Sequence, residues 1–201
     1  ALRTDRLDLY LVHWPVPGKH VDAYLELQDA VKAGKITSIG VSNYAAEDVD
    51  ELLDHPGVYI TPAVNQIELN PFLYRPKTLK YMADKGIVVQ AYRALRDGKA
   101  FEDPTVLRVA AKHGKTAAQV MGAWCLAKGA VYMPKSTKKA RMVENADVVS
   151  FQLDGDDLAA LDALTTEDAL AAFKALYEKC VVRDTPLSED DPGIKRDITA
   201  G

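Results

Sequence analysis

Hydrophobic and polar residues follow two periods along this chain, one typical of strands and one typical of helices. Five short runs are rich in β-branched and aromatic residues, have strand length and carry Gly or Pro near their ends: residues 7–13, 35–41, 61–66, 87–92 and 130–133. Elsewhere apolar residues recur every three to four positions, which predicts helices over residues 21–33, 46–55, 76–85, 103–113, 116–128 and 138–145, and another from 154 onward.

Several residues are placed to begin or end these helices. Gly34 follows the first helix, where a left-handed residue commonly ends the last turn, and Gly86 follows the third. Thr116 is suited to cap the N-terminus of its helix. Asp154 and Asp157 have the spacing of a capping box.

Strands that alternate with helices at this spacing predict βαβ units and a parallel sheet. Right-handed crossovers bring all the strand C-termini to one face, where loops build sites. The sequence contains neither G-x-G-x-x-G nor G-x-x-x-x-G-K-[ST], which disfavours a Rossmann or P-loop nucleotide site. An α/β fold of the (β/α) barrel type is the better prediction.

Composition narrows the class of protein. The 201 residues carry a net charge of −4 and are 48% hydrophobic and 27% charged, which excludes a disordered, collagen-like or disulfide-scaffold chain. Only Lys135–Arg141 is locally basic, which is too short for a nucleic-acid surface. No apolar run approaches the ~20 residues needed to cross a bilayer, so we expect no membrane partner. Cys125 and Cys180 lie in apolar helical stretches, which predicts two core thiols in a reducing compartment and a cytoplasmic location.

Polar side chains end all five predicted strands. The first strand ends in His13-Trp14-Pro15, and the second runs into Ser42-Asn43. The third ends at Asn65-Gln66, the fourth at Tyr92, and the fifth runs into Lys135-Ser136 with Arg141 and Glu144-Asn145 beyond. Each has an ordinary structural explanation, such as a cap or a core aromatic. Together, on one face of a barrel, they predict a functional site.

These stretches resemble, in order and spacing, the signature segments of the aldo-keto reductases, over about residues 5 to 166. The matching segments are His13-Trp14-Pro15, Gly40-Val41-Ser42-Asn43-Tyr44, Val64-Asn65-Gln66, Ala91-Tyr92 and Pro134-Lys135-Ser136 with Arg141 and Glu144-Asn145. The resemblance implies an NADPH-dependent reductase of aldehydes or ketones on an eight-stranded barrel. It also implies that this sequence supplies about five of the eight βα units and lacks the first strands.

The resemblance assigns the nicotinamide half of a cofactor site to positions in this sequence. Ser42, Asn43 and Gln66 would hold the nicotinamide carboxamide, and Tyr92 would stack on the nicotinamide ring. Leu95, in the loop that follows Tyr92, is counted with the cofactor-binding residues.

The adenosine half falls after the fifth strand. Lys135 and Ser136 would bind the 2′-phosphate, and Arg141 would add charge and stack on the adenine. Glu144 and Asn145 would take the adenine edge. Lys135 and Arg141 together favour NADPH over NADH, and no metal is implied.

The substrate end of the site is assigned to His13 and Trp14. His13 would orient the substrate carbonyl and stabilise the developing alkoxide, while Trp14 would line the pocket. The family's general acid is a Tyr tuned by a Lys and an Asp. Those residues belong to the first strands of the family barrel and have no match here.

The sequence departs from the family in two places. Arg93-Ala94-Leu95-Arg96 replaces the usual loop over the cofactor pyrophosphate, and its arginines either strengthen that grip or mark a loop adapted elsewhere. We divide the chain into a partial barrel over residues 1–166 and a C-terminal helix and acidic tail over residues 167–201. The helix expected over residues 168–180 carries Leu170, Phe173, Leu176, Tyr177 and Cys180 as an apolar stripe. Such a stripe usually packs on its own domain, and docking of a protein partner is the alternative.

A second function therefore stays open beside that of a reductase acting on a small carbonyl substrate. The altered loop and the C-terminal helix also fit a non-catalytic relative, a structural or regulatory subunit that keeps the NADP site without the reaction.

Overall fold

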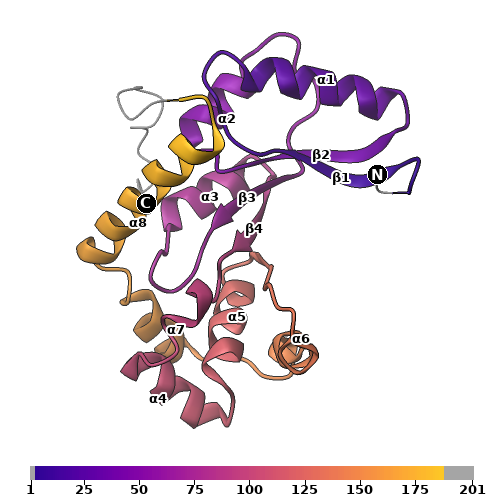
Figure 1. The fold of residues 1–201 in the computed structure, drawn as a ribbon. Helices are drawn as coiled ribbons and strands as arrows, with labels where there is room; N and C mark the ends of the chain where they lie inside the picture. Colours follow the sequence, from indigo (N-terminus) through magenta and orange to yellow (C-terminus); the bar gives the residue numbers. More distant parts are fainter. Residues whose placement is uncertain (1–2, 188–201) are drawn as a thin grey trace. The chain divides into compact units, whose positions relative to one another are not determined.

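The computed structural model describes residues 3–187, in which strands and helices alternate (Figure 1). The strands are β1 (Leu7–Val12), β2 (Ile36–Ser42), β3 (Val64–Glu68), β4 (Val88–Tyr92) and β5 (Val131–Tyr132). The helices are α1 (His20–Lys32), α2 (Ala46–Leu53), α3 (Pro76–Asp84), α4 (Pro104–His113), α5 (Ala117–Ala127), α6 (Lys139–Ala146), α7 (Gly155–Asp162) and α8 (Glu167–Asp184), with 3-10 turns η1 (Arg96–Gly98) and η2 (Asp147–Val149). The strands take chain order in the sheet, as expected of successive βα units.

The chain forms two compact units, each described by itself. Of the described residues, the first comprises 3–67, 76–88 and 174–187. The second comprises residues 68–75 and 89–173.

The first unit is built on β1, β2 and β3. β1 runs parallel to β2 from Leu7 opposite Ile36 to Val12 opposite Val41. α1 lies along these two strands (Figure 1). Residue 40 must be glycine, because a Cβ there would lie 2.7 Å from Cγ2 of Val64 and 2.8 Å from Cδ2 of Leu11. Gly40 is therefore the residue that allows β2 to pack this closely against Val64 of β3 and Leu11 of β1.

The second unit is built on β4, β5 and the buried helix α5. β4 runs parallel to β5, with Gln90 opposite Val131 and Ala91 opposite Tyr132. The indole Nε1 of Trp124, a fully buried residue of α5, donates a 2.8 Å hydrogen bond to Oδ1 of Asp162 at the end of α7. A helix of this hydrophobicity is stable only when it is covered on nearly all sides.

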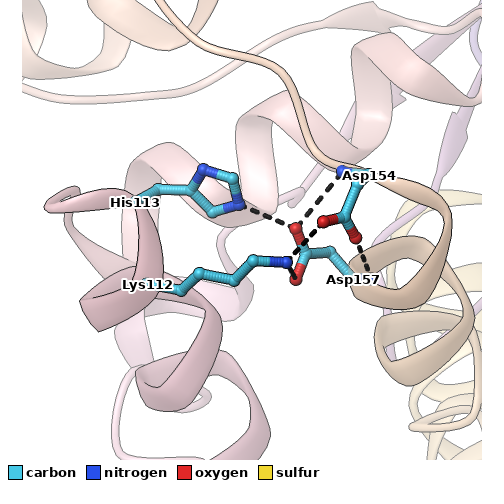
Figure 2. Close-up of polar contacts among 4 residues, drawn as sticks. All are labelled: Lys112, His113, Asp154 and Asp157. Carbon is cyan, nitrogen blue, oxygen red and sulfur yellow. Dashed lines mark hydrogen bonds and ion pairs between the residues drawn. The ribbon is translucent and has the colours of Figure 1, made fainter.

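Four charged or polar side chains join α4 to α7 in this unit (Figure 2). Nζ of Lys112 lies 2.5 Å from Asp154 Oδ2 and 2.8 Å from Asp157 Oδ1, and Nε2 of His113 lies 2.7 Å from Asp157 Oδ2. Asp157 is buried, so its carboxylate is satisfied by these contacts and not by water.

The predicted helix ends at Gly34, Thr116 and Asp154 are confirmed. Gly34 takes a φ of +73° just after the last turn of α1. Oγ1 of Thr116 accepts from the backbone N–H of Gln119, and Oδ1 of Asp154 accepts from that of Asp157, each within a reciprocal capping box.

Most bounds lie within two residues of the prediction, and those of β3 and α8 differ by more. β3 begins at Val64 and not at residue 61, because Pro62 has no N–H to donate to a ladder. α8 extends to Asp184 and not to 180, and its buried residues are Phe173, Tyr177 and Val181, spaced by four. The prediction that Leu176 shares this stripe is wrong, since it is 37% exposed. Residues 188–201 of the expected acidic tail lie outside the described residues.

The prediction of two core thiols is half confirmed. Both cysteines are free, but only Cys125 is buried, and Cys180 is intermediate in exposure. No helix in the part of the chain that the structure describes is long and apolar enough to cross a membrane.

Candidate functional site

Three of the expected site residues form a row across the C-terminal ends of β1, β2 and β3. Val12 stands opposite Val41, so His13 and Ser42 are the next step of the same register. Ser42 in turn stands opposite Gln66. The hydroxyl of Ser42 donates a 2.7 Å hydrogen bond to the carbonyl oxygen of Gln66. The strand ends are therefore held together by side chains at the point where a barrel places its functional groups.

Asn43 fastens this row from the loop after β2. Its φ is +64°, the left-handed conformation that Asn tolerates better than most residues. Its Nδ2 donates to the carbonyl oxygen of His13 at 3.0 Å and to Oγ of Ser42 at 3.1 Å, and its backbone N–H donates to the carbonyl oxygen of Gln66 at 3.0 Å. One buried residue thus bridges all three strands.

Asn65, one of the polar residues expected at the end of the third strand, supports the same loop. It is fully buried, and its Nδ2 donates to the carbonyl oxygen of Tyr44 at 2.9 Å while its Oδ1 accepts from the N–H of Tyr44 at 3.4 Å. A polar side chain inside an apolar strand was the available signal. Buried amides need partners, and here the partner is the backbone that follows Asn43.

The adjacent residues His13 and Trp14 differ in their exposure to solvent. The His13 side chain is exposed, whereas Trp14 is only 8% exposed. The two rings lie 5.4 Å apart, and the Trp14 ring also meets Tyr177 of α8 edge to face at 5.3 Å. The buried indole Nε1 of Trp14 makes no hydrogen bond within the described residues.

In the second unit the expected residues gather after β4 and β5. Tyr92 ends β4, and Met133 stays in register through a 3.2 Å hydrogen bond from its N–H to the carbonyl oxygen of Ala91. Pro134 ends the ladder because it has no N–H. Lys135 is exposed and Ser136 half-buried, with Oγ of Ser136 accepting from the N–H of Lys138 at 3.1 Å.

The positive charges at this end are not matched by carboxylates. Lys135 and Arg141 are exposed and form no ion pair with any residue in the described range 3–187. Glu144 is half-buried and Asn145 is buried on α6. Two unpaired cations beside a hydroxyl are suited to an anion such as a phosphate.

A cavity of about 480 Å³ adjoins these residues. Its polar lining comes from Tyr132, Ser136 and Asn145, and its remaining lining is apolar and includes Val131, Met142 and Val148. The Tyr132 hydroxyl is buried and makes no hydrogen bond within the described residues. A mostly apolar cavity with a few polar groups is typical of a small-molecule site.

The arginine side chains of the loop after β4 interact with other residues of the second unit. Arg93 pairs with Glu68 at 3.1 Å and with Asp97 at 2.9 Å, and the Arg96 guanidinium lies 4.7 Å from the centre of the Phe72 ring. Glu68 is buried, and burial raises its pKa although the two arginines act to lower it. Leu95, the other expected residue of this loop, is half-buried. The Arg93 charge is therefore already balanced inside the second unit.

Strands in βα succession with polar groups at their C-terminal ends define a protein of the (β/α)-barrel class. The chain belongs to the aldo/keto reductase family, whose signature matches residues 1–166. The fold predicted from the sequence, a fragment of the family's (β/α)8 barrel, is confirmed by this match and by the solved structures.

Characterised relatives and solved structures agree on the family. The chain is 39% identical to "Glyoxal reductase" of Bacillus subtilis (strain 168) over 167 residues, which cover 83% of this chain and 60% of that protein. It is 43% identical to an "Aldo-keto reductase" of Mycobacterium sp. (strain JLS), covering 84% and 60%.

Among solved structures, the chain is similar to the apo form of Gox0644, with a TM-score of 0.79, 38% identity and coverage of 84% of this chain and 62% of that one. It is also similar to a Gox0644 mutant in complex with NADPH, with a TM-score of 0.78, 37% identity and coverage of 82% and 61%. The chain thus spans about 60% of the length of the relatives it matches.

Proposed function

We propose that this chain carries most of the cofactor site of an NADPH-dependent carbonyl reductase. The observation that carries the proposal is the row of His13, Ser42 and Gln66 across three strand ends, bridged by Asn43. The family membership and the NADPH-bound structural relative support it.

The residues present fit such a cofactor. Lys135 and Arg141, which form no ion pair with the described residues, suit the 2′-phosphate that distinguishes NADPH from NADH, and Ser136 adds a hydroxyl. Glu144 and Asn145 on α6 offer acceptor and donor groups to an adenine edge.

At the other end, Ser42, Asn43 and Gln66 would bind a carboxamide, which needs both donors and acceptors. Tyr92 would offer an aromatic face for stacking, a contact of about 1 kcal/mol beyond burial, and Leu95 would contribute apolar contact beside it. Bound NADPH supplies the hydride that reduces the carbonyl.

His13 would act on the substrate. Its exposed imidazole can donate a hydrogen bond to the carbonyl oxygen, which stabilises the alkoxide as charge develops. Trp14 would form the adjacent apolar wall. We assign the general acid to a Tyr outside this sequence, in the family's first strands.

Direct titration tests the cofactor assignment. We expect calorimetry to show that NADPH binds more tightly than NADH, and that Lys135→Ala and Arg141→Ala each weaken NADPH binding roughly 10- to 100-fold, since a charge-assisted hydrogen bond contributes roughly 1.5–3 kcal/mol. NADH binding should not change in Lys135→Ala, and it should weaken less than NADPH binding in Arg141→Ala, because only the stacking on the adenine is lost there. Arg108→Ala, an exposed arginine on α4, is the matched control. Equal NADPH affinity in the parent and both variants would refute the phosphate site.

Turnover distinguishes the reductase from a non-catalytic relative. The absorbance of NADPH is followed with glyoxal as the carbonyl probe, in the full-length protein that carries this chain and in its His13→Ala variant. Oxidation of NADPH that falls at least tenfold in His13→Ala supports the reductase. Tight NADPH binding without any oxidation favours the structural or regulatory subunit, for which the internally paired Arg93 is the motivating observation.

A further inference from the structure

α8 lies beyond residue 166, where the family match ends, yet it packs on the expected site of the first unit. Tyr177 is 8% exposed, and its ring meets that of Trp14 edge to face, with centroids 5.3 Å apart and planes at 65°. An edge-to-face contact is favourable beyond the burial of area, because the positive edge of one ring faces the negative face of the other. The ring therefore fixes α8 to the His13-Trp14 segment.

The hydroxyl of the same tyrosine reaches the next strand end. It donates to the carbonyl oxygen of Asn43 at 3.4 Å. Asn43 is in the left-handed region, and its peptide group leads into Tyr44, which Asn65 holds from the other side. Tyr177 thus contacts the loop that orients the side-chain amide of Asn43.

Other residues of the C-terminal segment close around this contact. Val181, Thr185 and Leu187 line, with Trp14 and its neighbours, a cavity of only about 10 Å³, which is no more than the least volume that can hold one water molecule. The end of α8 also senses His13. The pKa of Asp184 is lowered mainly by its hydrogen bond from Arg183, against a smaller opposing effect of burial, and further by the charge of Arg183, while the charge of His13 makes the smallest contribution.

From these contacts we propose that Tyr177 is a positioning residue, which holds Asn43 in the geometry that binds the nicotinamide end of the cofactor. The inference rests on the proposed function for the cofactor part alone. By linkage, docking of α8 and binding of NADPH favour each other. A segment outside the family match thereby sets the affinity of a site inside it.

The test in the free protein uses Tyr177→Phe, which keeps the ring on Trp14 and removes the hydroxyl. Tyr59→Phe is the control, because Tyr59 is 66% exposed in the same unit. Hydrogen exchange measured by NMR should be faster at the amides of Asn43 and Tyr44 in Tyr177→Phe, and unchanged in the control. Unchanged exchange in Tyr177→Phe would overturn the proposal, whether or not the protein binds NADPH.

The test with cofactor uses calorimetry on the same variants. We expect Tyr177→Phe to bind NADPH about two- to tenfold more weakly, the effect of one net hydrogen bond, and Tyr59→Phe to match the parent. NADPH should also slow the exchange of α8 amides in the parent. If the parent binds NADPH and Tyr177→Phe binds it equally well, the positioning role is wrong. A parent that binds no NADPH refutes the proposed function, and the exchange at Asn43 then decides the role of Tyr177 separately.

Discussion

Nε2 of His113 lies 2.7 Å from Oδ2 of Asp157, which links the last turn of α4 to the first turn of α7. Lys112 reaches the other oxygen of the same carboxylate at 2.8 Å (Figure 2). Asp157 also accepts from the backbone N–H of Asp154 at 3.2 Å. A buried carboxylate with three donors contributes to stability only while all three are in place.

Replacing this carboxylate by an amide should destabilise the protein. We expect Asp157→Asn to lower the free energy of unfolding by about 1–3 kcal/mol, because Lys112 and His113 lose a charged acceptor that is shielded from water. Urea unfolding followed by circular dichroism measures the loss. Asp156→Asn, one residue earlier and exposed, should stay within about 0.5 kcal/mol of the parent. Equal losses in the two variants would show that the α4–α7 contact contributes nothing.

The same carboxylate predicts how stability depends on acid. Burial acts to raise the pKa of Asp157, but hydrogen bonds from Lys112 and His113 outweigh it and lower the pKa from 3.8 to about 2. A depressed folded pKa stabilises the protein above the unfolded value, so this contribution is complete above about pH 4 and is lost as the pH falls toward 2. The difference in urea midpoint between the parent and Asp157→Asn should therefore be smaller at pH 2.5 than at pH 5. A gap that stays constant with pH would contradict the assignment.

Gly40 should tolerate no side chain. A Cβ at this position would lie 2.7 Å from Val64 Cγ2 and 2.7 Å from the Val64 carbonyl oxygen, so the strands β2 and β3 would have to separate. We expect Gly40→Ala to cost about 1–3 kcal/mol in thermal or urea unfolding. Gly155→Ala is the matched control, since nothing lies within 4 Å of its Cβ and it begins α7. A parent-like Gly40→Ala would mean that these strands are not so closely packed.

The two thiols should differ sharply in reactivity. Burial raises the pKa of the Cys125 thiol to about 12, so almost no thiolate forms near neutral pH, whereas Cys180 is half-exposed. In native protein we expect iodoacetamide to label Cys180 first and Cys125 only after unfolding, as read by mass spectrometry of peptides. Cys180→Ser should then remain unlabelled under native conditions. Rapid native labelling of that variant would place Cys125 within reach of solvent.

Local patterns were enough to predict most of the fold and the strand-end residues. Strand and helix periods identify the elements to within a few residues, because burial on one face repeats at a fixed spacing. Capping boxes such as that of Thr116 are local in the chain, so they are readable without a structure. His13, Ser42 and Gln66 could be grouped because parallel strands bring their ends to one face.

Contacts between distant segments could not be read in this way. Tyr177 contacts Trp14 although most of the sequence lies between them, and no local pattern predicts which residues pair at such a separation. The apolar pattern expected over residues 168–180 contains both Leu176 and Tyr177, which are adjacent in the helix. Only the packing of α8 shows that Tyr177 is buried and Leu176 is exposed. The pairing of Arg93 with Glu68 depends likewise on where two loops meet.

Asn65 behaves as a substitute peptide group. Its side-chain amide offers one donor and one acceptor to Tyr44, as a residue on a neighbouring strand would, and so hydrogen bonding to β3 continues two residues past the end of β2. An aspartate at this position would keep the shape but could only accept, and a leucine could do neither. The reach of the sheet, and with it the place where the chain turns into the loop at Asn43, is thus set by a side chain as well as by the backbone.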